Sequence, residues 1–139
     1  MNRTERLLLD ASTWVASSDP DDRFHAQAFE LAVAAGLPVA ALDLTLYEVA
    51  NVIGARDGRL EDASQMTRLI AERCGEGLIR VDVDLAAAAI GLSAEHGLSA
   101  YDAAYVAAAR RHGWTLVSTD IRDLVSKGLA VTPDAADYP

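Results

Sequence analysis

The sequence is poor in cysteine and in long apolar runs, and each shortage excludes a class of protein. Cys74 is the only cysteine among the 139 residues, so a disulfide framework and a thiolate metal cluster are excluded. No apolar run approaches the ~20 residues that span a bilayer. The N-terminal leucines 7–9 lead directly to an acidic residue, which does not resemble a signal peptide. We therefore expect no membrane span and a place in the reducing cytoplasm.

Lysine is nearly absent as well, because Lys127 is the only one. The 12 basic residues are outnumbered by 21 acidic ones, which gives a formal net charge of −9. This excludes a broad basic surface for nucleic acid, since such binding depends on Lys and Arg that neutralise phosphates. If nucleic acid is the partner, contact must be local and helped by a bound cation. The acidity suits a basic protein partner equally well.

What the sequence does contain is an apolar fraction of 51 %, enough for one core in one domain of 139 residues. We expect this core within residues 6–132 and a loosely held tail over residues 133–139.

Strand-like and helix-like segments alternate along the whole chain. The predicted strands cover residues 6–10, 37–42, 78–83, 115–118 and 129–132. The predicted helices cover residues 11–16, 24–35, 45–56, 60–73, 85–95 (capped by Asp84) and 121–127, with another that starts after Ser99. Such alternation predicts the α/β class, with a central, mostly parallel sheet flanked by helices on both faces.

Acidic residues occupy matching positions in this pattern. Asp10 and Asp120 each follow a predicted strand, whereas Glu48 and Asp102 each fall in the predicted first turn of a helix. Ligands of open α/β sheets bind beyond the carboxyl ends of the strands, so all four can meet at one edge.

Each acid also has a purely structural interpretation. Ser99 with Asp102, and Thr45 with Glu48, match the capping box of a helix start. Asp10 and Asp120 are suitable N-caps for the helices that follow them. Spacing alone therefore leaves capping and metal binding both open.

If the four carboxylates converge, each pair at ~6 Å repels by roughly 3 kcal/mol at an effective dielectric of ~20. Such a cluster must take up protons or a cation. Ligands that are all oxygen favour Mg²⁺ or Mn²⁺ over zinc, and these ions suit the hydrolysis of phosphodiester bonds.

Four segments of the chain resemble the motifs of the PIN domain, and in particular of the small VapC-like ribonuclease toxins of toxin–antitoxin pairs. The similarity extends over about residues 6–132. The segments are LLLDAST around Asp10, TLYEVANVI around Glu48, LSAYDAAYVAAAR around Asp102 and LVSTDIRDL around Asp120. Each segment alone is weakly specific, whereas all four in this order are strongly so.

The resemblance implies that these four acids are catalytic and hold one or two Mg²⁺ or Mn²⁺ ions for the hydrolysis of RNA. It implies supporting roles for three polar residues: Ser12, Asn51 and Thr119. It further implies a homodimer and a small antitoxin partner that blocks the site. An aromatic residue often follows the last motif in the family; Leu124 stands there, which we expect to affect packing more than chemistry.

Other polar and aromatic residues remain open. Three arginines are candidate phosphate contacts or ordinary solvated side chains: Arg56, Arg59 and Arg122. Three aromatic residues beside the motifs either pack in the core or stack on a base: Trp14, Tyr47 and Tyr101.

Two alternative functions also remain open. One is a non-catalytic PIN-like module that binds a protein partner. The other is a phosphoryl-transfer or receiver-like α/β domain. The chain has no Asp-x-Asp pair after the first strand and no Gly-rich phosphate loop, which argues against the second.

Overall fold

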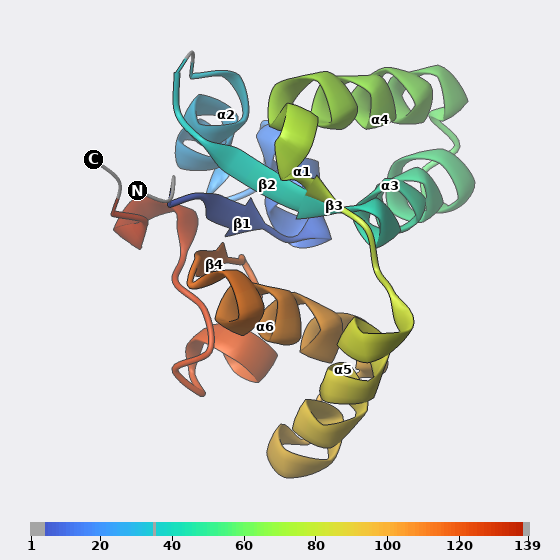
Figure 1. The fold of residues 1–139 in the computed structure, drawn as a ribbon. Coiled ribbons are helices and arrows are strands. Elements are labelled where there is room, and N and C mark those ends of the chain that lie inside the picture. Colours follow the sequence, from blue (N-terminus) through green and yellow to red (C-terminus); the bar gives the residue numbers. More distant parts are fainter. Residues whose placement is uncertain (1–4, 35, 138–139) are drawn as a thin grey trace.

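In a computed structural model, the chain forms a four-stranded sheet between two layers of helices (Figure 1). The structure describes residues 5–34 and 36–137. The strands are β1 (Leu7–Leu9), β2 (Val39–Leu42), β3 (Leu78–Ile79) and β4 (Thr115–Val117). The helices are α1 (Ala11–Ser17), α2 (His25–Val33), α3 (Asp43–Val49), α4 (Leu60–Cys74), α5 (Val83–His96) and α6 (Ala100–His112). Shorter helical segments are η1 (Ala50–Arg56), η2 (Gly75–Gly77), η3 (Ile121–Val125) and η4 (Pro133–Ala135).

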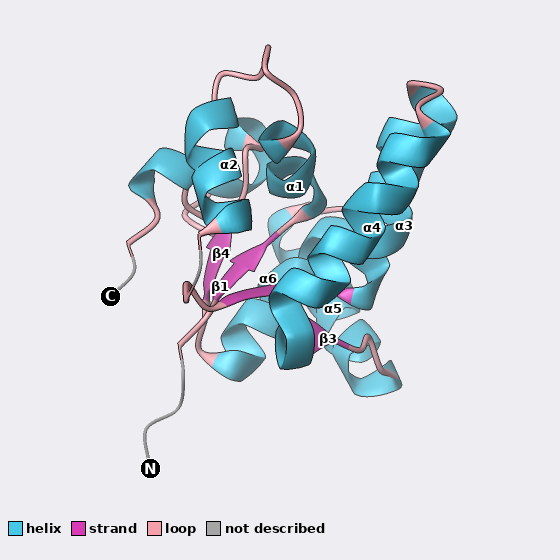
Figure 2. Ribbon diagram, turned by 90° about the horizontal axis from the view of Figure 1, so that it is seen from above, coloured by secondary structure: helices cyan, strands magenta, loops and turns pink. Residues whose placement is uncertain are grey.

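The sheet is apolar on both faces. Leu7 and Leu9 of β1 pack with residues of α1, α2 and α4, whereas Leu8, on the opposite face, packs with residues of α5 and α6. Alternate strand residues point to opposite sides, so three consecutive leucines serve both cores. Figure 2 shows the pairs α1–α2 and α3–α4 as separate groups of helices. The predicted α/β architecture is confirmed.

The direction in which successive strands are added to the sheet reverses beside β1. The strand order is β3-β2-β1-β4, and every pairing is parallel. From β1 the chain moves outward through β2 to β3, then returns through α5 and α6 to place β4 on the other side of β1. The carboxyl ends of β1 and β4 therefore flank a switch point, where α/β sheets bind ligands.

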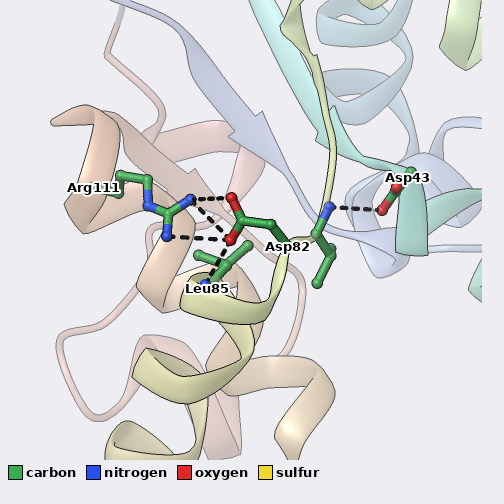
Figure 3. A network of polar contacts seen from close by, with 5 residues as sticks. Asp43, Asp82, Leu85 and Arg111 are labelled. Carbon is green, nitrogen blue, oxygen red and sulfur yellow. Dashed lines mark hydrogen bonds and ion pairs between the residues drawn. The ribbon is translucent and has the colours of Figure 1, made fainter.

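The predicted cap of α5 is wrong, because Asp82 rather than Asp84 begins this helix. Asp82 has extended backbone angles, and its carboxylate accepts the N–H of Leu85 at 2.7 Å. Arg111 near the end of α6 donates to the same carboxylate over 3.3–3.5 Å (Figure 3). The guanidinium and the Leu85 N–H lower the pKa of Asp82. This tertiary contact stabilises the earlier start.

Strands at the sheet edges are shorter than predicted. The predicted strand 78–83 contributes only two residues, because its neighbour β2 ends at Leu42, opposite Ile79. The predicted strand 129–132 is reduced to one bridge, between Val131 and Val117. The predicted helix 121–127 is a single π-helical segment that ends at Val125.

Two other segments differ from the prediction. The predicted helix 24–35 ends at Val33, and residue 35 lies outside the described residues. The beginning of the expected loose tail is instead held, because Pro133 is buried and Ala136 packs on the core. Among the described helices, none combines the length and apolarity that crossing a bilayer requires.

Candidate active site

Asp10 lies directly after β1 and is buried, with 4 % of its surface exposed. Its Oδ1 accepts hydrogen bonds from the Ser12 hydroxyl at 2.6 Å and from the Thr13 N–H and hydroxyl at 3.1 and 3.2 Å. Asp10 is thereby the N-cap of α1. These donors fix the direction of the carboxylate at the carboxyl end of β1.

Serine hydroxyls connect the end of β1 to the end of β4. Ser12 Oγ accepts the N–H of Thr119 at 3.0 Å and lies 3.3 Å from Ser118 Oγ. Ser118 Oγ accepts the N–H of Asp120 at 3.0 Å, and its hydroxyl also bonds the Asp10 carboxylate. The segments that contain Asp10 and Asp120 are therefore held together by buried and half-buried polar contacts.

Asp102 and Asp120 meet at this edge with a third acid. One carboxylate oxygen from each of Asp102, Asp120 and Asp123 lies within 4.8 Å of the other two. Ser99 caps α6 as predicted and accepts the N–H of Asp102 at 3.1 Å. Asp120 caps η3 by accepting the N–H of Asp123 at 3.0 Å. Helix capping and convergence thus occur together. Ser99 caps the helix that carries Asp102, and the Asp120 carboxylate is itself a cap.

Glu48 reaches the same edge from a different position on its helix than predicted. α3 begins at Asp43, so Thr45 is not its N-cap and Glu48 lies in the second turn. Thr45 Oγ1 instead accepts the N–H of Leu42 at 3.1 Å. Glu48 Oε1 accepts a hydrogen bond from the Tyr105 hydroxyl of α6 at 2.7 Å. The predicted capping box was wrong, whereas Glu48 does lie close enough to Asp10 and Asp102 to respond to their charges.

The acids affect one another electrostatically. Burial raises the pKa of Asp10, against the opposing effect of its hydroxyl and N–H donors. Burial also raises the pKa of Glu48, with further contributions from Asp10 and Asp102. The pKa of Asp102 rises to about 6 through burial and the charges of Asp120, Asp10 and Asp123. Asp102 therefore lies close enough to Asp10, Asp120 and Asp123 to respond to their charges, and Glu48 responds to the charges of Asp10 and Asp102.

The donor set fits a hard divalent cation. The salt bridges of the described residues involve other acids, so none of these five carboxylates is neutralised by a basic side chain in an ion pair. Ligand oxygens around Mg²⁺ lie about 3–4 Å apart, given metal–oxygen distances of ~2.1 Å. The spacing of at most 4.8 Å among Asp102, Asp120 and Asp123 needs only a small contraction to meet this.

A hollow of about 540 Å³ lies beside Glu48 and is lined also by Asn51 and Val52. Tyr47 from α3 and Tyr101 from α6 line it, with 79 % and 58 % of their surfaces exposed. Core packing is therefore excluded for both tyrosines. Trp14, in contrast, is fully buried and belongs to the core.

The candidate arginines differ in position. Arg56 lies about two turns beyond Glu48, at the end of η1, and pairs with Asp57 at 3.3 Å. Arg59 is the N-cap of α4 and pairs with Asp62 at 3.4 Å. Arg122 is exposed on η3, between Asp120 and Asp123 in sequence. Only Arg122 is thus directly beside the cluster of acids.

Sequence reasoning did not identify Asp123, Ser118 and Tyr105 as parts of the site. For Asp123 a signal was available, because it lies three residues after Asp120 and this spacing places both on one side of a helix. Ser118 falls at the end of a predicted strand, directly before two candidate residues, which was an available signal. No sequence pattern indicated Tyr105, because its hydroxyl meets Glu48 only where the fold brings α6 close to α3.

Comparison with known proteins agrees with this arrangement. The model of the PIN domain family matches residues 7–126, which include all five acids. Ribonuclease VapC3 of Pyrobaculum aerophilum is 36 % identical over 133 residues, which cover 92 % of this chain and 99 % of that protein.

Solved structures share the fold. The sarcin-ricin loop cleaving toxin VapC20 of Mycobacterium tuberculosis superposes with a TM-score of 0.69 at 22 % identity, covering 88 % of this chain and 95 % of that one. A toxin–antitoxin complex from Klebsiella pneumoniae gives a TM-score of 0.67 at 21 % identity, covering 91 % and 97 %. With the family model matching most of its length, the chain belongs to the PIN domain family.

Proposed function

We propose that the protein is an endoribonuclease that hydrolyses RNA phosphodiester bonds with the help of Mg²⁺ or Mn²⁺, and that it is the toxin of a toxin–antitoxin pair. The observation that carries the proposal is that Asp102, Asp120 and Asp123 lie within 4.8 Å of one another and that Asp10 and Glu48 lie close enough to Asp102 for their charges to interact. The ion pairs among the described residues involve none of these five acids. The nearly full-length similarity to a VapC ribonuclease supports the choice of RNA.

The residues that would hold the cation are Asp10, Glu48, Asp102 and Asp120, and we add Asp123. When bound, a divalent ion lowers the pKa of water and offsets charge on the phosphate. A carboxylate of the cluster accepts a hydrogen bond from the attacking water and so directs it at phosphorus. Since every donor is an oxygen, Mg²⁺ and Mn²⁺ are preferred over zinc.

The polar neighbours have supporting roles in this proposal. Ser12 fixes the Asp10 carboxylate and the turn after β4. Asn51 lines the hollow beside Glu48, where its amide can bond a phosphate or a base edge. Thr119 presents its hydroxyl at the turn. Arg122 contacts phosphate beside the cluster.

Arg56 ends η1, which continues the helix of Glu48, and Arg59 is the N-cap of α4; both would contact more distant phosphates. Their pairing with exposed acids is worth little and is easily exchanged for a phosphate.

The decisive experiment is cleavage of end-labelled RNA with Asp102→Asn. We expect Mg²⁺- or Mn²⁺-dependent cleavage by the wild type, its loss in EDTA, and a decrease of at least ~100-fold in the variant. Asp84→Asn, an exposed acid of α5, is the matched control and should cleave like the wild type. Purified protein that binds no divalent ion and leaves every RNA intact would contradict the proposal.

We also propose two protein partners: a second copy of the chain and a basic antitoxin. The toxin–antitoxin complex from Klebsiella pneumoniae shares the fold, and the net charge of −9 favours a basic partner. Light scattering of the protein alone, and then with the product of an adjoining small gene, tests both. The alternative of a non-catalytic binding module predicts that the five acids are dispensable, which their convergence argues against.

A further inference from the structure

Tyr105 connects two helices through its hydroxyl. Its ring lies in the core with 1 % of its surface exposed, on α6 one turn after Asp102. Its Oη lies 2.7 Å from Glu48 Oε1 and 2.7 Å from Thr45 Oγ1, both on α3. Thr45 is fully buried, so this chain of contacts is largely shielded from water.

The number of available protons determines which group donates in each of these hydrogen bonds. Thr45 Oγ1 already accepts the N–H of Leu42, the last residue of β2. The ionised Glu48 has no proton to give, so the Tyr105 hydroxyl donates to it. Tyr105 has only one hydroxyl proton, and Thr45 must therefore donate to Tyr105. Three hydrogen bonds run in one sense, from the backbone of β2 to the Glu48 carboxylate.

Glu48 depends on this single anchor more than Asp10 depends on any one of its donors. Asp10 is held by Ser12 and Thr13, whereas Tyr105 is the hydrogen-bond partner that the described part of the chain offers the Glu48 carboxylate. A glutamate side chain has three rotatable bonds, and one charge-assisted bond to a rigid, packed ring fixes one of its oxygens.

We infer that Tyr105, itself oriented by Thr45, is a positioning residue that holds the Glu48 carboxylate in place to bind a divalent cation. This inference rests on the proposed function, because it assigns Glu48 to the cation. A merely structural role for Tyr105 is different: Thr45 alone could satisfy its hydroxyl, and removal of that hydroxyl would alter folding without altering Glu48.

The test is Tyr105→Phe, with Mn²⁺ binding measured by titration calorimetry and cleavage of RNA measured in parallel. We expect the dissociation constant for Mn²⁺ to rise roughly 10- to 100-fold, as is typical for partners of metal ligands. We expect kcat to fall with little change in KM for RNA. Thr45→Val should produce part of this loss, whereas Thr45→Ser, which retains the hydroxyl, should restore it. Thr67→Val, on the exposed side of α4, is the control for hydroxyl removal.

A double-mutant cycle shows whether Tyr105 acts through Glu48. In a Glu48→Gln background, Tyr105→Phe should cause no further loss of Mn²⁺ affinity. Wild-type Mn²⁺ affinity in Tyr105→Phe, or an equal loss in both backgrounds, would overturn the inference while leaving the proposed function intact. A wild-type protein that neither binds Mn²⁺ nor cleaves RNA would overturn the proposed function, and this inference with it. If Tyr105→Phe fails to fold, the Thr45→Val and Thr45→Ser pair decides in the same way.

Discussion

At the scale of single residues, Ser12 has the most connected position in the site. Its hydroxyl proton goes to Asp10, and its oxygen accepts the N–H of Thr119 from the segment after β4. One small side chain therefore holds two acidic segments that lie more than a hundred residues apart in the sequence.

Ser12→Ala should accordingly affect both stability and activity. We expect the free energy of unfolding to fall by about 1–3 kcal/mol, because a buried carboxylate loses a donor and a backbone N–H loses an acceptor. RNA cleavage should slow as Asp10 and Asp120 lose their relative placement. Denaturant unfolding and cleavage kinetics measure the two effects. Ser64→Ala, exposed on α4, is the matched control and should change neither. A variant with wild-type values in both assays would show that Ser12 is not a connector.

At the scale of elements, α3 and η1 present one continuous face. Residues spaced three and four apart lie on the same side of a helix, and here they line the hollow that Tyr101 closes from α6: Leu44, Tyr47, Glu48, Asn51 and Val52. Apolar and aromatic side chains thus adjoin the acids. A neutral base suits such a surface better than a phosphate does, in a protein of net charge −9.

Tyr47→Ala and Tyr101→Ala should weaken RNA binding without destabilising the fold. Stacking of a base on an aromatic ring is worth ~1–3 kcal/mol, so we expect KM for RNA to rise roughly 5- to 150-fold in each variant, with a smaller change in kcat. Both rings are largely exposed, and thermal unfolding should hardly change. Ile90→Ala, 68 % exposed on α5, is the control. Unchanged KM in both tyrosine variants would exclude stacking at this hollow.

At the scale of the whole molecule, the ionised acids of the site lower the stability of the metal-free fold. Asp10, Glu48 and Asp102 all have raised pKa values, so the folded state binds their protons more tightly than the unfolded state does. For Asp102 the resulting stabilisation is complete below the unfolded pKa near 3.8 and is lost as the pH rises through about 6. A divalent cation reverses this trend, because it binds the deprotonated cluster.

Thermal unfolding in EDTA should therefore give a lower Tm at pH 7.5 than at pH 4.5. For Asp102 alone we expect a difference on the order of 1–2 kcal/mol after solvent screening, or roughly 3–8 °C. Mn²⁺ at pH 7.5 should restore the Tm. Asp102→Asn should show a smaller pH dependence and a weaker response to Mn²⁺, whereas Asp84→Asn should behave like the wild type. A Tm in EDTA that is constant or rises over this pH range would contradict the expectation.

The sequence by itself determined the α/β class and indicated the four acids first proposed for the site. Alternating apolar segments can satisfy their backbone and bury their apolar faces only as strands covered by helices, and three consecutive leucines at residues 7–9 require a core on both sides. Local signals also fixed the cap of α6 at Ser99, because that hydrogen bond spans only three residues.

Only the tertiary structure decided which caps form, how long the edge strands are and which side chains complete the site. Asp82 rather than Asp84 caps α5, and Arg111 from another helix contacts the same carboxylate, while β3 stops where β2 stops. Tyr105 of α6 meets Glu48 of α3, and Asp102 meets Asp120 and Asp123, only because the fold brings separate elements together. Contacts of this kind depend on the relative placement of whole elements, which local hydrogen bonds and periodicity do not encode.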